Sequence, residues 1–203
     1  MRSRSLLLFL LLLVMGGPAL AENATVWYEQ GVSLLNQSEY GAASRAFETA
    51  TLLEPENTWI WLELGKSLRL QNRQADAYEA FTKATETDPA NTWAWIFRGT
   101  SLQDRGLVSR AIGMYSHAIR TDPENAWAYY HQGTAWMVLS RYPEAKEAFT
   151  RSVSLDPANP WGWFNLGMTH RAYGNYTGYQ DCLRTATAID PGIPAKVGLG
   201  TLF

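Results

Sequence analysis

The sequence predicts an all-α protein, an α-solenoid built from five helix–turn–helix repeats of 34 residues each. Two kinds of residue recur at this interval. They are a proline, at Pro55, Pro89, Pro123, Pro157 and Pro191, and a glycine, at Gly31, Gly65, Gly99, Gly133 and Gly167. The copies occupy 24–57, 58–91, 92–125, 126–159 and 160–193 without insertion or deletion, and cover 170 of the 203 residues. A fixed period of this length indicates units that bury their apolar faces against one another.

The first element, residues 1–21, is expected to be a secretory signal peptide. Arg2 and Arg4 precede ten unbroken apolar residues, Leu6–Met15, and the segment Ala19-Leu20-Ala21 provides a small-x-small cleavage site before Glu22. An uncleaved membrane anchor is the alternative, but ten helical residues span about 15 Å, half of a hydrocarbon core of roughly 30 Å. We therefore expect a secreted or extracytoplasmic protein without a stable membrane span after cleavage, whose solenoid domain is 22–203.

Each repeat is expected to contain two helices of roughly 12–15 residues. The breaks between them fall near Ser38, Asn72, Gly106, Ser140 and Gly174. The first helices follow asparagines that can cap them, namely Asn57, Asn91, Asn125 and Asn159. The second helices end at acid–proline pairs, since proline restricts the residue before it: Glu54-Pro55, Asp88-Pro89, Asp122-Pro123, Asp156-Pro157 and Asp190-Pro191.

The same motif can be followed through the repeats in chain order. The first repeat carries Trp27, Gly31, Leu34, Ala43, Phe47, Ala50 and Pro55. The second carries Trp61, Leu64-Gly65, Leu68, Ala77, Phe81, Ala84 and Pro89. The third carries Trp95, Gly99, Leu102, Ala111, Tyr115, Ala118 and Pro123, and the fourth Tyr129, Gly133, Trp136, Ala145, Phe149, Ser152 and Pro157. The fifth is weaker, with Trp163, Leu166-Gly167, Leu183, Ala186 and Pro191, and Tyr179 at its position 20.

This pattern resembles the tetratricopeptide repeat, whose signature has an aromatic at position 4, Leu-Gly at 7–8, Ala at 20, an aromatic at 24, Ala at 27 and Pro at 32. The resemblance implies a right-handed solenoid. Glycine at position 8 and alanine at position 20 leave room for two backbones to approach, and the aromatics fill the space around that contact. Three repeats depart at position 7, where Gln30, Arg98 and Gln132 leave polar groups near a packing face.

The first helix of each repeat carries a second stripe, at positions 2, 5, 9 and 12, roughly 130° from the packing stripe. By family resemblance, this stripe lines a concave groove that holds extended or helical peptides. Position 2 is tryptophan in four consecutive repeats, Trp59, Trp93, Trp127 and Trp161, which we call the tryptophan ladder. Position 5 is Tyr28, Leu62, Ile96, Tyr130 and Phe164. Positions 9 and 12 supply the groove cations Lys66, Arg69 and Arg171.

Two interpretations of the ladder compete. In the first, each indole packs against position 5 of the next repeat and widens the core, as apolar stripes at helical spacing usually do. In the second, the rings stay partly open and anchor a partner. The lysine–asparagine clamp with which some family members hold acidic C-terminal peptides is not reconstructed here, because positions 2 and 5 are aromatic or aliphatic. The three cations have an alternative interpretation as solvated surface charges, which are more common than binding sites at such positions.

The residues that enzymes and metal sites require are scarce in this chain. It has one cysteine and three histidines, and it lacks a Gly-rich phosphate loop, an HExxH and a GxSxG motif. We expect no enzyme, with no catalytic residue, no metal and no cofactor. The net charge of −2 also lacks the basic excess typical of proteins that bind nucleic acid.

Three further features remain. His170 takes a packing position and is expected in the core, His131 lies near the groove, and Cys182 is expected to be buried, with cross-linking of two chains as the alternative. Export would make three sequons candidate N-glycosylation sites, at Asn23, Asn36 and Asn175. The short tail 194–203 either forms a stunted turn over the fifth repeat or leaves an end that docks another protein or a second copy.

The expected function is a noncatalytic interaction scaffold for a protein or peptide partner outside the cytoplasm. The tryptophan ladder, with Tyr28, Tyr130 and Phe164, would bury apolar partner surface, and Lys66, Arg69 and Arg171 would set its polarity. The alternative is a binder of carbohydrate or cell-wall glycan, because aromatic faces also stack on sugar rings.

Overall fold

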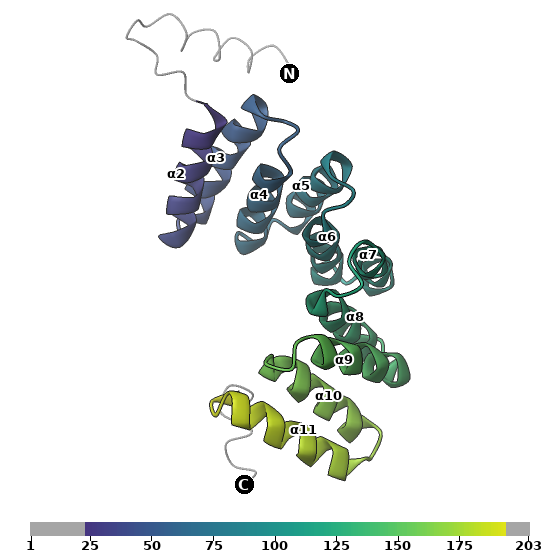
Figure 1. Ribbon diagram of the computed structural model, residues 1–203. Coiled ribbons are helices and arrows are strands. Elements are labelled where there is room, and N and C mark those ends of the chain that lie inside the picture. The colour runs from purple at the N-terminus through teal and green to yellow at the C-terminus, as the bar shows by residue number, and fades with distance from the viewer. Residues whose placement is uncertain (1–22, 194–203) are drawn as a thin grey trace, which may run out of the picture.

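The computed structural model describes residues 23–193, which form ten α-helices arranged as an arc of five hairpins (Figure 1). The first helices of the hairpins are α2 (Ala24–Asn36), α4 (Thr58–Leu70), α6 (Thr92–Asp104), α8 (Ala126–Val138) and α10 (Pro160–Ala172). The second helices are α3 (Tyr40–Leu53), α5 (Gln74–Thr87), α7 (Val108–Thr121), α9 (Tyr142–Leu155) and α11 (Tyr176–Ile189). The predicted all-α solenoid is confirmed. The expectations for the signal peptide 1–21 and the tail 194–203 lie outside the described residues.

In the turn inside each hairpin, the residue at position 15 adopts the left-handed backbone conformation, with a positive φ. Its φ is 62° at Ser38, 61° at Asn72, 76° at Gly106, 56° at Ser140 and 73° at Gly174. In each turn, the next backbone N–H then donates to a carbonyl five residues back, as from Arg73 to Leu68 at 3.0 Å. This pattern satisfies carbonyls that the end of a helix leaves open, so these are the breaks that the sequence predicts.

The first helices begin at the predicted asparagine caps. The side-chain oxygen of Asn57 accepts from the N–H of Trp59, and that of Asn91 from the N–H of Ala94, at 3.2 and 3.1 Å. Asn125 and Asn159 cap α8 and α10 in the same way. Because the cap lies two residues before position 2, it fixes the start of the helical turn that carries each ladder tryptophan.

The glycine at position 8 lies under the aromatic ring at position 24 of the same hairpin. A Cβ added to Gly65 would lie 2.4 Å from Cε1 of Phe81, and one added to Gly99 would lie 2.5 Å from Cε1 of Tyr115. Phe81 and Tyr115 are fully buried. The two helices of a hairpin therefore approach so closely that only glycine fits between backbone and ring.

Tryptophans at position 4 link successive repeats. The indole N–H of Trp61 donates to the carbonyl of Pro55 at 2.7 Å, and Trp95 and Trp163 donate to Pro89 and Pro157 at 2.8 and 2.9 Å. Two of the most regular residues of the motif are thus hydrogen-bond partners, and the loop between repeats is fixed to the following helix.

The polar residues at position 7 find partners on the preceding second helix. Arg98 donates to the hydroxyl of Tyr78 and to Oγ1 of Thr85, at 3.1 and 3.2 Å, and Gln132 donates to Oγ of Ser116 at 2.9 Å. These bonds offset much of the desolvation cost of polar side chains on a packing face, although Nε of Arg98 is buried without a hydrogen-bond partner.

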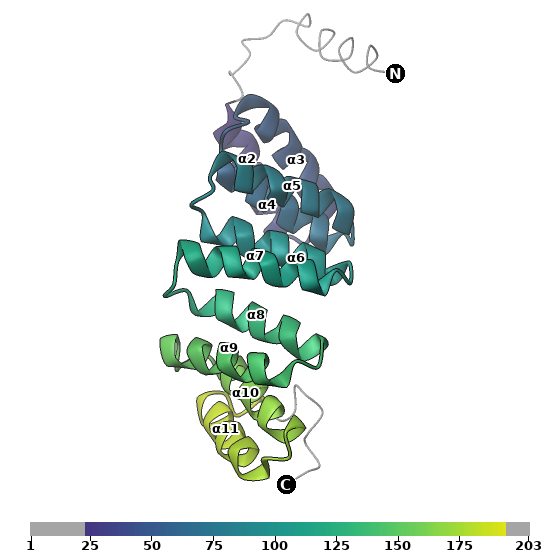
Figure 2. The same cartoon turned by 90° about the vertical axis from the view of Figure 1, so that its right-hand side faces the viewer.

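The repeats stack one after another along the molecule (Figure 2). Successive first helices contact one another, α2 with α4, α4 with α6, α6 with α8 and α8 with α10. In Figure 1, α4 and α6 lie on the inner side of the arc, and α5 and α7 lie on its outer side. The first helices therefore line the concave face. Among residues 23–193, no helix is long and apolar enough to cross a membrane.

Candidate functional site: the concave face

Three of the four ladder tryptophans are exposed on the first helices. The exposed fraction is 56% for Trp59, 36% for Trp93 and 41% for Trp127. Trp161 is half-buried and packs with Phe164 against a cluster formed by Leu183, Ala186 and Ile193. The ladder is thus open over three repeats and partly covered in the fifth.

Aromatic side chains of the same helix support the ladder rings. Trp93 stacks on Phe97, with centroids 5.9 Å apart, and Trp127 meets the ring of Tyr130 edge-on at 5.5 Å. Trp161 meets Phe164 in the same way at 6.1 Å. The packing interpretation of the ladder predicted contacts with position 5 of the next repeat, whereas these supports lie three or four residues along the same helix. The rings of Trp93, Trp127 and Trp161 are therefore held in place while part of their surface faces solvent.

Fewer residues at position 5 line the groove than the stripe predicts. Leu62 and Ile96 are 1% and 0% exposed, so they belong to the core and do not line the groove. Ile96 packs with Ala118 and Ala128, the latter on the first helix of the following repeat. The neighbouring first helix covers this position, because successive first helices touch along the inner side. Tyr28, Tyr130 and Phe164 are larger and stay half-buried.

Position 6 contributes groove residues that the stripe analysis did not include. Phe97 joins the ring of Phe81, at 5.5 Å, to that of Trp93. Asn165 donates to the hydroxyl of Tyr130 at 3.1 Å, across two repeats. Because position 6 lies about one helical turn after position 2, the i, i+4 spacing is the signal that identifies Phe97 as the support of Trp93.

The groove cations are largely engaged within the chain. Lys66 pairs with Glu63 at 2.6 Å on the same helix, and Arg69 of α4 pairs with Asp104 of α6 at 3.0 Å. The guanidinium of Arg171 lies over the Tyr179 ring, 5.7 Å from its centroid. Lys66 and Arg69 therefore bring no net positive charge to the concave face.

His131 lies between aromatic rings near the centre of the groove. It stacks on Tyr115 with centroids 5.7 Å apart and also meets Trp127 and Tyr130. Burial, with a smaller contribution from the charge of Arg69, lowers the pKa of His131 to about 4. The imidazole is accordingly neutral at pH 7 and forms part of the aromatic lining.

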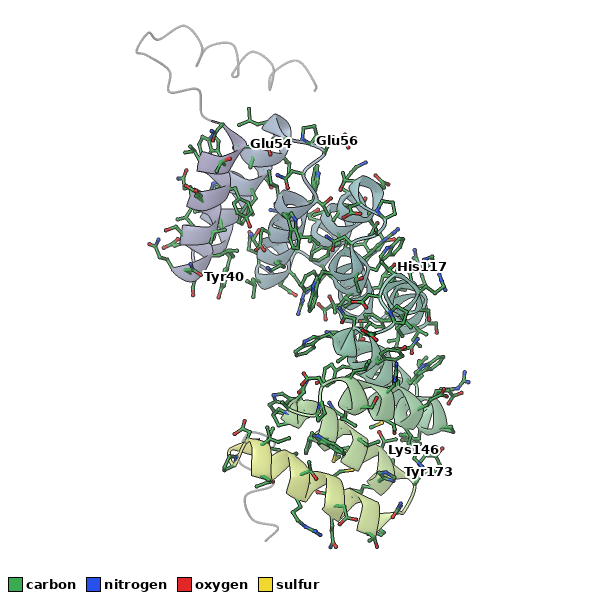
Figure 3. The ribbon with its side chains drawn as sticks, in the orientation of Figure 1. Tyr40, Glu54, Glu56, His117, Lys146 and Tyr173 are labelled. Atoms are coloured by element: carbon green, nitrogen blue, oxygen red, sulfur yellow. The ribbon has the colours of Figure 1, made fainter. Side chains whose placement is uncertain are left out.

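The other singled-out residues lie away from the ladder. His170 is half-buried near the end of α10, with its Nδ1 3.1 Å from Nδ2 of Asn175. His117 lies on the outer side of the arc, stacked on Trp95 at 4.5 Å (Figure 3). Cys182 is 7% exposed, and burial raises the pKa of its thiol. A buried thiol of this kind is a poor nucleophile.

The three sequon asparagines are exposed, and two of them also cap helices. Asn23 accepts from the N–H of Val26 at the start of α2, and Asn175 accepts from the N–H of Gly178 at the start of α11. Asn36 is the last residue of α2. Within the described ranges, no three His, Cys, Asp or Glu residues lie close enough together to hold a metal ion.

Comparisons with known proteins give one consistent assignment. A family model described as tetratricopeptide repeat matches residues 28–92 and 98–160, more than half of the chain. No curated protein sequence matches the chain.

Solved structures resemble the chain in fold. A crystal structure of the MamA protein superposes with a TM-score of 0.71 at 21% identity, covering 87% of this chain and 96% of that one. MamA from Desulfovibrio magneticus RS-1 gives 0.73 at 18% identity, covering 84% and 97%. YrrB, a TPR protein with an unusual peptide-binding site, gives 0.64 at 19% identity, covering 87% and 93%. At these identities the likeness establishes the arrangement of the helices.

Proposed function

Because the chain belongs to the tetratricopeptide repeat family, we propose that it is a noncatalytic scaffold that binds a polypeptide partner along its concave face. Solenoids of this family typically serve in protein–protein interaction. The partner would lie across the first helices as an extended or helical segment and contact several repeats at once.

The open part of the tryptophan ladder is the observation that carries the proposal. Trp59, Trp93 and Trp127 occupy the same position in consecutive repeats, and each exposes more than a third of its surface. Tryptophan is among the residues that contribute most to binding at protein interfaces, because a large rigid ring loses little entropy on contact. Rings supported by Phe97 and Tyr130 are also preorganised, which lowers the entropic cost of binding.

The fold neighbours are compatible with this function. YrrB is a TPR protein with a peptide-binding site, and its helices superpose on 87% of this chain. The arc of the present chain offers the same kind of curved surface, lined by first helices (Figure 1). These points support a polypeptide ligand as a class.

The proposal also places the protein outside the cytoplasm. Its support is the sequence of residues 1–21, with two arginines, an apolar run and a small-x-small motif. N-terminal sequencing of the protein recovered from the producing cells should begin at Glu22. A sequence that begins at Met1 would contradict cleavage and export by this route.

The binding proposal can be tested with peptides selected from a random 12-residue display library against the protein. We expect the Trp93→Ala/Trp127→Ala double variant to lose at least about tenfold in affinity for the selected peptides, since each anchor contributes upwards of about 1 kcal/mol. Isothermal titration calorimetry provides the dissociation constants.

A matched control is available on the second helices, where Leu52 and Tyr176 are also exposed. Leu52→Ala/Tyr176→Ala should bind as the unmodified protein does. Equal losses in both double variants, or a loss confined to the second, would contradict binding on the concave face. Selective retention of oligosaccharides rather than peptides would instead favour the glycan-binding alternative.

A further inference from the structure

The recess beside Trp59 combines two aromatic side chains with a carboxylate. A pocket of about 260 Å³ is lined by Tyr28 of α2, by Trp59 and Ile60 of α4, and by Glu54 and Asn57 of the intervening loop. A more open depression of about 580 Å³ shares Glu54, Asn57 and Trp59 with this pocket and is lined also by Glu56 and Asp88. The most exposed ring of the ladder thus lines two adjoining hollows together with three acidic residues.

These carboxylates are not neutralised within the chain. Within residues 23–193, neither Glu54, Glu56 nor Asp88 forms an ion pair. Glu54 accepts a hydrogen bond from Nδ2 of Asn57 at 2.9 Å, which holds it at the mouth of the recess. Glu54 and Glu56 lie together at the end of the first hairpin that is opposite to Tyr40 (Figure 3).

The same charge recurs along this edge of the solenoid. The loops after the second helices, residues 54–57, 88–91, 122–125, 156–159 and 190–193, contain seven acidic residues and no Lys, Arg or His. We call these loops the acidic edge. Each of the first four ends two residues before a ladder tryptophan in the sequence, so the negative charge lies beside the ladder.

The chain's own cations leave the ladder rings unoccupied. In the part of the chain that the structure describes, the cation–π contacts use the rings of Phe97, Tyr78, Trp95, Trp136, Tyr129 and Tyr179, and none uses a ladder tryptophan. Lys66 and Arg69 are paired with acids of the groove. A tryptophan face is the ring surface that attracts cations most strongly, so an open indole beside unpaired carboxylates is complementary to a positive charge.

From this geometry we infer that the Trp59 recess binds a lysine or arginine side chain of the partner, and that the partner is a basic polypeptide segment whose further cations follow the acidic edge. The inference rests on the proposed function, because it names the class of polypeptide that the concave face holds. The cation stacks on the indole, its charge is compensated by Glu54, Glu56 and Asp88, and the apolar stem of the residue lies against Tyr28 and Ile60.

The experiment uses three fluorescein-labelled 12-residue peptides that differ only at four positions, which hold lysine, glutamine or glutamate. Fluorescence anisotropy with the whole protein at low salt should give the tightest binding for the lysine peptide. We expect it to exceed the glutamine peptide by about tenfold or more and to weaken as salt is added. Equal binding of lysine and glutamine peptides, or tighter binding of the glutamate peptide, overturns the inference.

Substitutions at the recess separate cation recognition from simple apolar contact. Trp59→Leu should weaken the lysine peptide by about tenfold, whereas Trp59→Phe, which keeps an aromatic face, should retain much of the affinity. Glu54→Gln/Glu56→Gln/Asp88→Asn should weaken the lysine peptide and flatten its salt dependence. The matched triple variant Glu48→Gln/Glu79→Gln/Glu147→Gln removes the same charge from exposed acids of second helices and should leave the affinity unchanged.

The outcomes distinguish this inference from the function on which it rests. If glutamine and lysine peptides bind equally and both depend on Trp93 and Trp127, the groove function stands and the inference falls. If peptides bind without dependence on any ladder tryptophan, both fall. Binding of an oligosaccharide at Trp59 that does not displace the lysine peptide would likewise overturn the assignment of a basic polypeptide.

Discussion

Tryptophans occupy two different surroundings on the first helices, two residues apart. At position 4, the indoles of Trp61, Trp95 and Trp163 each donate to a proline carbonyl of the preceding loop. At position 2, Trp59, Trp93 and Trp127 keep a large exposed surface. The first set fixes the junction between repeats, and the second set remains available for a partner.

Sequence position alone separates these two sets but leaves the exposure of the second undecided. A helical stripe of apolar residues usually marks core, and Leu62 and Ile96 do behave in this way. The tryptophans do not, because position 2 lies two residues after the asparagine cap, in the first turn of the helix. The exposure of Trp59 depends on how far the neighbouring repeat reaches over that end, which is a property of the stack.

At the residue scale, Gly65 provides a test of the close packing inside a hairpin. Gly65→Ala places a Cβ 2.4 Å from Cε1 of Phe81, and the buried ring has no room to move away. We expect the free energy of unfolding to fall by about 1–3 kcal/mol, even though alanine is the better helix former. Urea titration followed by circular dichroism measures the change.

Gly113 of α7 is the matched control, since nothing lies within 4 Å of a Cβ added there. Gly113→Ala should leave the stability unchanged or raise it by up to about 1 kcal/mol through helix propensity. Equal effects of the two substitutions would contradict the contact between glycine and ring.

Each helix of the solenoid has ends that local chemistry determines. The first helices start at Asn57, Asn91, Asn125 and Asn159, and their side chains accept from the first free N–H groups. The second helices end at acid–proline pairs, such as Asp88 and Pro89. Because caps, prolines and turn residues act within a few positions, these helix ends could be predicted from the sequence.

The contacts between elements were less accessible to prediction. Arg98 appears in the sequence as a polar residue on a packing face, and only the structure brings it to Tyr78 and Thr85 of the preceding helix. The bond from Trp95 to Pro89 joins two motif residues that the sequence treats as independent. Such partners depend on the rotation of each helix against its neighbour, which a one-dimensional pattern does not contain.

At the element scale, Asn91 tests the role of the caps. Asn91→Ala removes the oxygen that accepts from the N–H of Ala94 and should lower the free energy of unfolding by about 1 kcal/mol. Asn91→Asp keeps an acceptor at the same place and should retain most of the stability. Thermal unfolding of the three proteins, monitored by circular dichroism, gives the comparison. Equal destabilisation by alanine and aspartate would show that the cap does not contribute.

Over the whole molecule, the stacking of five hairpins turns local regularities into surfaces. The first helices line the inner side of the arc, so residues 34 positions apart in the sequence come to lie along one face (Figure 1). The ladder is therefore a consequence of repetition. The acidic edge arises in the same way, because every loop after a second helix carries an acid before its proline.

The repeat period allowed the architecture to be predicted, while the character of the concave face required the structure. The sequence singled out Lys66 and Arg69 as residues that would set the polarity of the groove, but Glu63 and Asp104 pair with them. The pair between Lys66 and Glu63 is local to one helix, whereas the salt bridge between Arg69 and Asp104 joins neighbouring repeats and does not follow from the motif. The electrostatic balance of the groove is thus set by the stacked assembly.

The most direct measurement of the central claim, that the concave face binds a polypeptide, is hydroxyl-radical footprinting of the tryptophans with and without a selected peptide. Mass spectrometry reports the oxidation rate of each ring in one experiment. We predict that saturating peptide lowers the rates of Trp59, Trp93 and Trp127 severalfold and leaves those of Trp61, Trp95 and Trp163 unchanged. Unchanged rates for the ladder, with protection instead around Leu52 or Tyr176 on the second helices, would contradict the claim.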